Sequence, residues 1–279
     1  MSLGCRKLIF LLLVCVLIAG CGQSSEPDSS QASNETDTVS TTTSKPAPPP
    51  KVIRESPYIR PSQDQKMWAM ALGALLTQHN GGRHDILGGH ERTPEEIQAW
   101  RASLAAWWDI ETRADLITSL NWIEKRGHRE DFDEFATYIE TASSEDIADL
   151  RREFQGDPEA LNQLELALEY HESFGDKSIL AWDYGRYVSL CGWGYVVGFL
   201  TEDEALRKMM PVARQMQTTF ESWEDFGQNY LVGREFWSLA QTRTNGNRMR
   251  QSYLTLLSNP ESPWVKLAWN LNLEPPETP

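Results

Sequence analysis

The segment from Trp182 to Phe199 constrains the fold most strongly, because it is apolar in almost every direction when it is drawn as a helix. Such a helix has to be buried on most sides, so we expect it at the centre of its domain. The segment also contains four glycines, Gly185, Gly192, Gly194 and Gly198. Each glycine inside a helix costs about 1 kcal/mol relative to alanine. Close packing is therefore expected to offset this loss.

The spacing of these glycines indicates where neighbours approach. Gly185 and Gly192 share one face of the predicted helix, whereas Gly194 and Gly198 share a nearly opposite face. Because glycine has no side chain, helix backbones can come close on both faces. We therefore expect the segment to be packed between two neighbouring helices.

Signals for helix starts recur along the chain after residue 60. Thr93 precedes Pro94 and is followed by Glu96, and Thr201 with Glu204 repeats this capping pattern. Apolar residues recur at helical spacing, and no comparable alternating strand pattern is present. The sequence therefore predicts an all-α fold, with a single globular multi-helix domain around the glycine-rich central helix.

The predicted helices span residues 62–78, 93–108, 112–126, 130–141, 144–154, 158–173, 178–199, 202–219, 222–241, 247–258 and 263–271. Pro211 lies inside one of these segments and is expected to kink or divide it, because proline lacks the N–H that a helix interior needs.

The N-terminus has the pattern of a secretory signal peptide. Arg6 and Lys7 precede the apolar run from Leu8 to Ala19, which is too short to span a bilayer as a mature helix. We therefore assign residues 1–20 to a signal peptide and exclude them from the folded domain.

The end of this segment resembles the lipobox of bacterial lipoproteins. The residues concerned are Leu17, Ile18, Ala19, Gly20 and Cys21. The resemblance implies cleavage before Cys21 and attachment of lipid, including acyl chains such as palmitate, to its sulfur. Ile18 departs from the pattern, since leucine is usual there. Gly22, and not aspartate, follows Cys21, which implies the outer membrane facing the periplasm if the cell is Gram-negative. An ordinary secreted protein with a chance cysteine is the alternative.

Composition and charge limit the classes of molecule that the protein can bind. Residues 21–60 are rich in Ser, Thr and Pro and poor in apolar side chains, so they are predicted to form a disordered tether before a domain at 61–279. The whole chain has a formal net charge of −14. Arg6 and Lys7 contribute +2, and residues 21–60, with five acids and four bases, contribute −1. Residues 61–279 therefore carry −15. Such a domain is repelled by phosphate backbones, so no nucleic acid is expected as a partner. A protein partner in the envelope or a basic ligand is expected instead.

Asp183 and Arg186 are the leading candidates for a polar site. They lie three residues apart on the helix that we expect to be buried, so they can form an ion pair. A buried charge without a partner is very unfavourable. Two interpretations remain open at this point: a structural ion pair that ties helices together, or the floor of a pocket that orients a polar ligand or water.

Other residues suggest weaker candidates. A glycine-rich loop carries His79, His84, Asp85 and His90, whose side chains are suitable metal ligands, although their spacing matches no known metal motif. The alternative is a mobile polar loop. His128 follows Gly127 at a predicted helix end, where its ring is expected to interact with terminal carbonyls. No cofactor is expected.

A series of residues in the second half of the chain is similar to a known family. The series comprises Trp182, Asp183, Arg186, Trp193, Gly194, Tyr195, Gly198, Glu204, Ala205, Ser222, Trp223, Tyr230, Gly233, Phe236 and Trp237. A looser upstream series comprises Trp107, Trp108, Ile110, Leu120, Gly127, His128 and Phe132. Together they resemble the bacterial family called domain of unknown function 1266, over most of residues 65–240. The resemblance implies a helical fold and no established activity or catalytic residues.

The sequence favours a binding or interaction module over an enzyme. No nucleophile elbow, phosphate-binding loop or paired acids in a clear context are present, and Cys191 on the apolar segment is interpreted as a small buried hydrophobe. The leading hypothesis is therefore a lipid-anchored binding module of the bacterial envelope. The alternative is an unrecognised hydrolase or metal-dependent enzyme that uses the Asp183/Arg186 pair or the histidine-rich loop.

Overall fold

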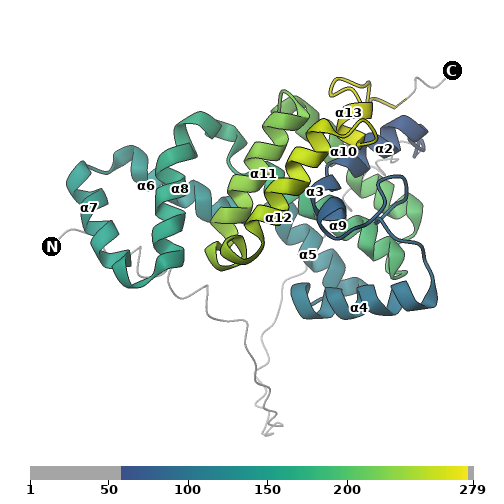
Figure 1. Ribbon diagram of the computed structural model, residues 1–279, viewed down its shortest axis with the longest axis horizontal. Helices are drawn as coiled ribbons and strands as arrows, with labels where there is room; N and C mark the ends of the chain where they lie inside the picture. Colours follow the sequence, from purple (N-terminus) through teal and green to yellow (C-terminus); the bar gives the residue numbers. More distant parts are fainter. Residues whose placement is uncertain (1–57, 276–279) are drawn as a thin grey trace, which may run out of the picture. The chain divides into compact units, whose positions relative to one another are not determined.

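The computed structural model describes residues 58–275, and all regular structure within this range is helical (Figure 1). This confirms the predicted all-α fold class. The predicted signal peptide, the lipidation site at Cys21 and almost all of the predicted tether lie outside the described residues. Among the helices of the described range, none is both long enough and apolar enough to cross a bilayer.

The helices are α2 (Gln63–Ala71), α3 (Ala74–His79), α4 (Pro94–Trp108), α5 (Arg113–Lys125), α6 (Arg129–Thr141), α7 (Ser144–Glu153), α8 (Pro158–Phe174), α9 (Leu180–Val196), α10 (Glu202–Thr219), α11 (Trp223–Trp237), α12 (Leu239–Ser258) and α13 (Pro263–Lys266). In Figure 1, α6, α7 and α8 lie together at one end of the helical domain.

Helix α9 is the centre of the domain, as its apolar sequence predicts. It packs most extensively against α11, α10 and α5, and it also contacts α2, α3 and α4. Every residue from Ala181 to Gly194 is buried. A helix that is covered on all sides in this way places any polar side chain it carries in the interior, which is why Asp183 and Arg186 become structurally important.

The glycines of α9 admit close neighbours on different sides. A β-carbon on Gly185 would come within 2.7 Å of the Tyr230 ring on α11, and one on Gly194 would overlap Leu116 on α5. A β-carbon on Gly192 would lie 2.8 Å from the Cα of Gly88, in the loop that follows α3. The absent side chains therefore let two helices and one loop reach the central helix.

The C-terminal boundary predicted for this helix was wrong. The helix ends at Val196, and Gly198 has a φ of +84°, in the left-handed region that terminates helices. The carbonyl of Gly194 accepts hydrogen bonds from the backbone N–H groups of Phe199 and Leu200. Gly198 therefore forms the exit turn of α9 and provides no packing face within the helix.

The predicted helix starts are confirmed by their caps. Thr93, Asp157, Thr201 and Ser262 each accept a hydrogen bond from a backbone N–H in the first turn of the helix that follows. Thr201 and Glu204 form the reciprocal capping box. Local side-chain chemistry is sufficient to set these boundaries, which is why they can be read from the sequence.

Helix α10 runs unbroken past Pro211, so the predicted division at this proline was wrong. Pro211 is exposed, whereas Met209, Met210, Val212 and Ala213 beside it are buried. The proline ring and the carbonyl that loses its partner therefore lie on the solvent side, where water can satisfy that carbonyl. Packing of the opposite face keeps the helix continuous.

Two other boundaries differ from the prediction, and contacts with distant residues are present at both. The segment predicted as one helix at 62–78 is divided between α2 and α3 at Gly73, where a β-carbon would lie 3.0 Å from Ser189 Oγ on α9. The predicted loop at 242–246 is helical within α12. That helix begins at Leu239, whose N–H donates to Glu159 of α8 at 2.6 Å.

Candidate functional site

A buried ion cluster lies where the turn between α5 and α6 meets α9. Asp183, which is 0% exposed, accepts hydrogen bonds from Arg186 Nη2 at 2.8 Å and from Arg129 Nη1 at 3.0 Å. Arg186 is the partner that the sequence indicates, whereas Arg129 comes from a segment more than fifty residues away. One carboxylate therefore joins two guanidinium groups across two helices.

The backbone of the turn completes the coordination of Asp183. The N–H groups of His128 and Arg129 donate to its two oxygens at 3.0 and 3.1 Å. Gly127 has a φ of +67°, and a β-carbon there would overlap the carboxylate. Only glycine can therefore occupy this position without displacing the acid.

Asp183 remains ionised in this setting. Burial by itself would raise the pKa of its carboxyl group, but hydrogen bonding from His128 and the charge of Arg186 outweigh burial, so the pKa lies below its usual value. Its four acceptor positions are occupied by two backbone N–H groups and two guanidinium groups. The carboxylate therefore has no acceptor position left for a donor outside the protein.

Arg186 is held between aromatic rings. Its guanidinium carbon lies 4.2 Å from the centre of the Trp182 ring and 5.5 Å from that of Trp108, and its Nε donates to the carbonyl of Trp182 at 3.2 Å. Burial lowers the pKa of this guanidinium and the neighbouring Asp183 opposes the effect, and arginine remains charged in proteins. The charge of Arg186 is therefore fixed in position and orientation.

Arg129 holds the C-terminal end of α5. Its Nη1 donates to the carbonyl of Ile123 at 2.6 Å, and its Nη2 donates to that of Glu124 at 2.7 Å. A cation is favourable at this end of a helix because the terminal carbonyls carry partial negative charge. Arg129 therefore has other acceptors besides Asp183, and its role is to tie the turn to α5.

His128 is neutral and turned toward Arg186. Its Nδ1 lies 2.6 Å from Arg186 Nη2, and because arginine has only donors, Nδ1 must accept and the proton lies on Nε2. Burial and the charge of Arg186 lower the pKa of His128 to about 4. The predicted contact of this ring with terminal carbonyls is not what the structure has: His128 is the N-cap residue of α6, and its ring contacts Arg186.

Partly exposed rings surround His128, and we call Trp122, His128 and Trp237 the aromatic rim. Trp122 is 38% exposed and its ring lies 5.1 Å from that of His128, at a right angle to it. The Trp237 ring lies 6.5 Å from His128 and 5.4 Å from Trp182, which is buried beneath the rim. The rim therefore presents partly exposed rings around the histidine that accepts from Arg186.

A family model described as Protein of unknown function (DUF1266) matches residues 103–269. The chain belongs to this family. The DUF1266 match starts later and ends later than the similarity expected at 65–240, and it contains the whole ion cluster and the aromatic rim. No curated protein and no solved structure matches the chain.

The histidine-rich loop precedes the DUF1266 match, and its candidate ligands have separate partners. His84 Nε2 lies 3.0 Å from Gln78 Oε1, His90 Nδ1 lies 3.3 Å from Glu96, and Asp85 pairs with Arg83. Nδ1 of His79 is buried without a hydrogen-bond partner. Within residues 58–275, no three histidine, cysteine or acidic side chains converge as a metal site would require. The metal site at His79, His84, Asp85 and His90 stays a prediction.

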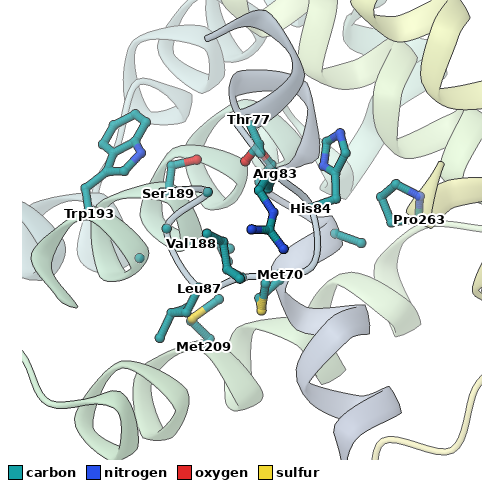
Figure 2. A pocket seen from close by; sticks show the side chains of 16 residues that line it. Met70, Thr77, Arg83, His84, Leu87, Val188, Ser189, Trp193, Met209 and Pro263 are labelled. Carbon is teal, nitrogen blue, oxygen red and sulfur yellow. The ribbon is translucent and has the colours of Figure 1, made fainter. Parts of the chain in front are cut away.

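A small hollow lies beside this loop and away from the ion cluster. It has a volume of about 20 Å³, enough for one ordered water. Figure 2 shows Met70, Leu87 and Met209 on one side of it and Thr77 and His84 on the other. Neither member of the Asp183/Arg186 pair lines it.

Cys191 is fully buried on α9 in this DUF1266 domain, and burial raises the pKa of its thiol. The thiol therefore stays protonated and packs as a small apolar group, as the sequence indicates.

Sequence reasoning missed Arg129, Trp122 and Trp237. A usable signal was present for the first: a glycine directly before His128 and Arg129, at the start of an acidic helix, is a turn whose N–H groups can bind a carboxylate. Trp122 precedes His128 by six residues across the turn between α5 and α6, so this contact was open to local reasoning. Trp237 was noted only as part of the family series, and tertiary packing brings α11 to His128.

Proposed function

We propose that this protein is a lipid-anchored binding module of the bacterial envelope and that its helical domain engages its ligand or partner at the aromatic rim. The observation that carries the proposal is the position of the rim. Trp122 and Trp237 keep ring surface exposed beside His128, and the ion cluster beneath them is locked by hydrogen bonds on every side of Asp183. Exposed aromatic rings on rigid support are typical of recognition surfaces.

The anchor is proposed from the lipobox at Leu17 to Cys21. Each buried methylene of an acyl chain contributes about 0.8 kcal/mol, so more than one chain on Cys21 would give stable attachment without a spanning helix. A domain with a strong negative charge is repelled by anionic headgroups, which favours attachment through a lipid and a tether over a basic membrane patch. Gly22, and not aspartate, follows Cys21, so the location proposed for a Gram-negative cell is the outer membrane, facing the periplasm.

The partner that fits an acidic domain is an envelope protein with a basic surface, or a ligand small enough to reach the rim. Electrostatic attraction would speed the encounter with a basic partner, and the rings would provide the contact area. Nucleic acid is not proposed, since its phosphates would be repelled.

The anchor is tested by labelling the full chain in bacterial cells with a fatty-acid probe. We expect the label to be present on the natural sequence and absent after Cys21→Ser. Cys5→Ser is the matched control, because Cys5 lies within the predicted signal peptide and its loss leaves the lipidated residue intact. Label that persists in Cys21→Ser would refute the anchor.

The binding role is tested by crosslinking the full chain to envelope components and comparing two tryptophan variants. Trp122→Ala removes a ring of the rim, whereas Trp107→Ala removes a ring that is 68% exposed and contacts no other described aromatic ring. We expect Trp122→Ala to lose the crosslinked species that both the natural chain and Trp107→Ala retain. Identical patterns for all three proteins would contradict a role for the rim.

A further inference from the structure

We infer that the buried donor groups beneath the aromatic rim bind the carboxylate group of a small organic ligand. This inference rests on the proposed binding function and names the ligand chemistry of the same site. It follows from three features of the residues around Trp182: buried donors without acceptors, buried cations with few anions, and partly exposed rings nearby.

The first feature is a set of unpartnered donors. Trp182 and Tyr230 are 4% and 1% exposed, and neither the Trp182 Nε1 nor the Tyr230 Oη has a hydrogen-bond partner within the described residues. Buried Trp and Tyr side chains usually find such a partner, and leaving one unpaired is destabilising. On Arg186, Nε and Nη2 donate hydrogen bonds, whereas Nη1 makes none to any described residue. An acceptor is therefore missing from this region.

These donors belong to one group of neighbouring side chains. The Trp182 ring lies against the Arg186 guanidinium at 4.2 Å and meets the Tyr230 ring edge-on at 5.2 Å. Two glycines bring them together, because a β-carbon on Gly185 would press on Tyr230 and one on Gly233 would overlap Trp182. Burial raises the pKa of the Tyr230 phenol, so its hydroxyl remains available as a donor.

The second feature is an excess of buried positive charge. Arg234, on α11, is buried and makes no ion pair among the described residues; it donates to the hydroxyl of Thr242 at 3.1 Å and to the carbonyl of Gln241 at 3.3 Å. The charges of Arg186 and Arg234 both act on the Tyr230 hydroxyl. Arg186 shares its one carboxylate, Asp183, with Arg129. One more negative charge near Tyr230 would therefore reduce this excess.

The neighbouring residues and the charge of the domain determine which kind of ligand can bind here. A cation is excluded by Arg186, which already occupies the faces of Trp108 and Trp182 that a cationic ligand would need. A polyphosphate would be repelled by the acidic domain as a whole. A monovalent carboxylate carries one charge, accepts from several donors at once, and can carry an apolar body that rests on the rim. Tyr230, Trp182 and Arg186 would bind the carboxylate, and Trp122 and Trp237 would flank its body.

The test is calorimetric titration of the purified full chain in detergent, at pH 7 and constant ionic strength, with formate, acetate and benzoate. Benzamide serves as the neutral counterpart of benzoate. We expect saturable binding of at least one carboxylate, at least tenfold tighter than that of benzamide, since a charge-assisted hydrogen bond is worth about one order of magnitude in affinity or more. Chloride at the same concentration is expected to compete only weakly.

Two variants locate the binding. Tyr230→Phe removes one donor and Arg234→Gln removes one buried charge, and each is expected to weaken carboxylate binding about tenfold. Tyr187→Phe is the matched control, because Tyr187 is a buried tyrosine of α9 that makes no contact with this group. Circular dichroism checks that each variant is folded, and if Tyr230→Phe is not, Arg234→Gln decides the question.

The outcomes separate this inference from the function it rests on. Failure of all three carboxylates to bind, equal binding of benzoate and benzamide, or unchanged binding by both variants would overturn the carboxylate site. An ordered water in place of the ligand would appear as lost stability in Tyr230→Phe without carboxylate binding, which also overturns it. Loss of crosslinking in Trp122→Ala together with any of these results would leave the binding module intact and remove only the carboxylate assignment.

Discussion

The neutral state of His128 makes the protein sensitive to acid in a way that can be calculated. In the folded protein the Nδ1 of His128 accepts from Arg186 at 2.6 Å, and burial together with that cation lowers its pKa from the ordinary 6.5 to about 4. The unfolded chain binds a proton at this residue below pH 6.5, whereas the folded chain does not until about pH 4. Unfolding therefore takes up one proton between these values, and stability falls as the pH falls through this window.

The size of the effect follows from proton linkage. One proton taken up on unfolding changes the free energy of unfolding by about 1.4 kcal/mol for each pH unit. Across the interval between pH 6.5 and pH 4, His128 should therefore account for a loss of about 3 kcal/mol. This is a large part of the 5–15 kcal/mol that typically separates folded from unfolded domains.

The assay is urea unfolding of the full chain, followed by tryptophan fluorescence at a series of pH values from 8 to 4. His128→Asn is the informative variant, because its side-chain oxygen can accept from Arg186 in place of Nδ1 but does not titrate. Between pH 6.5 and pH 4, the free energy of unfolding of this variant should fall by about 3 kcal/mol less than that of the natural chain. The lowered pKa values of His79 and His84 and the raised values of Asp131 and Asp133 affect both proteins alike.

A second histidine provides the control. His171, on α8, has its Nδ1 2.9 Å from the backbone carbonyl of Ala167 and makes no ion pair within the described residues. His171→Asn shows how much of any change comes from exchanging a histidine for an asparagine in itself. Parallel curves for the natural chain and His128→Asn would refute the argument, since they would mean that His128 does not titrate differently in the folded and unfolded states.

Two further predictions concern the ion cluster. Asp183→Asn leaves Arg186 and Arg129 without their carboxylate, so the free energy of unfolding should fall by about 3 to 5 kcal/mol in urea titrations; a loss below 1 kcal/mol would contradict the central role of the acid. Gly127→Ala should cost about 3 kcal/mol or more, because it combines backbone strain with overlap of Asp183, whereas Gly81→Ala, with a φ of +72° and open space around it, should cost only about 1 kcal/mol. Equal losses in the two alanine variants would show that strain alone matters and that the contact with Asp183 does not.

The parts of the fold that depend on neighbouring residues in the chain could be predicted from the sequence. Thr93 and Thr201 cap their helices as their local patterns indicate, and the apolar surface of α9 required its central position. The predictions that were wrong concern helices whose boundaries or continuity also depend on packing against residues far away in the chain. Glu159 from α8 adds to the cap that Ser238 gives the start of α12, and Pro211 is tolerated because it lies on the exposed face of α10.

The same distinction between local and distant contacts applies to the candidate site. Asp183 and Arg186 could be paired from their spacing, because three residues on one helix bring side chains together. The orientation of His128 could not be predicted, because it depends on Arg186 from another helix. Trp122 lies six residues before His128 at the same turn, but nothing local indicated that Trp237 of α11 would lie beside this histidine as well. Tertiary packing completes this cluster of rings, so single-sequence patterns reveal its parts and leave their arrangement open.

The two interpretations of the Asp183/Arg186 pair, structural tie and ligand site, apply to different members of the pair. All four acceptor positions of Asp183 are filled by protein donors, so this carboxylate has none left for a ligand and acts by positioning. Arg186 still has an Nη1 that binds no described residue, and it lies against Trp182, whose Nε1 is also unpaired. A ligand at this site would therefore touch Arg186 and never Asp183. Substitution of Asp183 should then alter ligand affinity only through the orientation of Arg186.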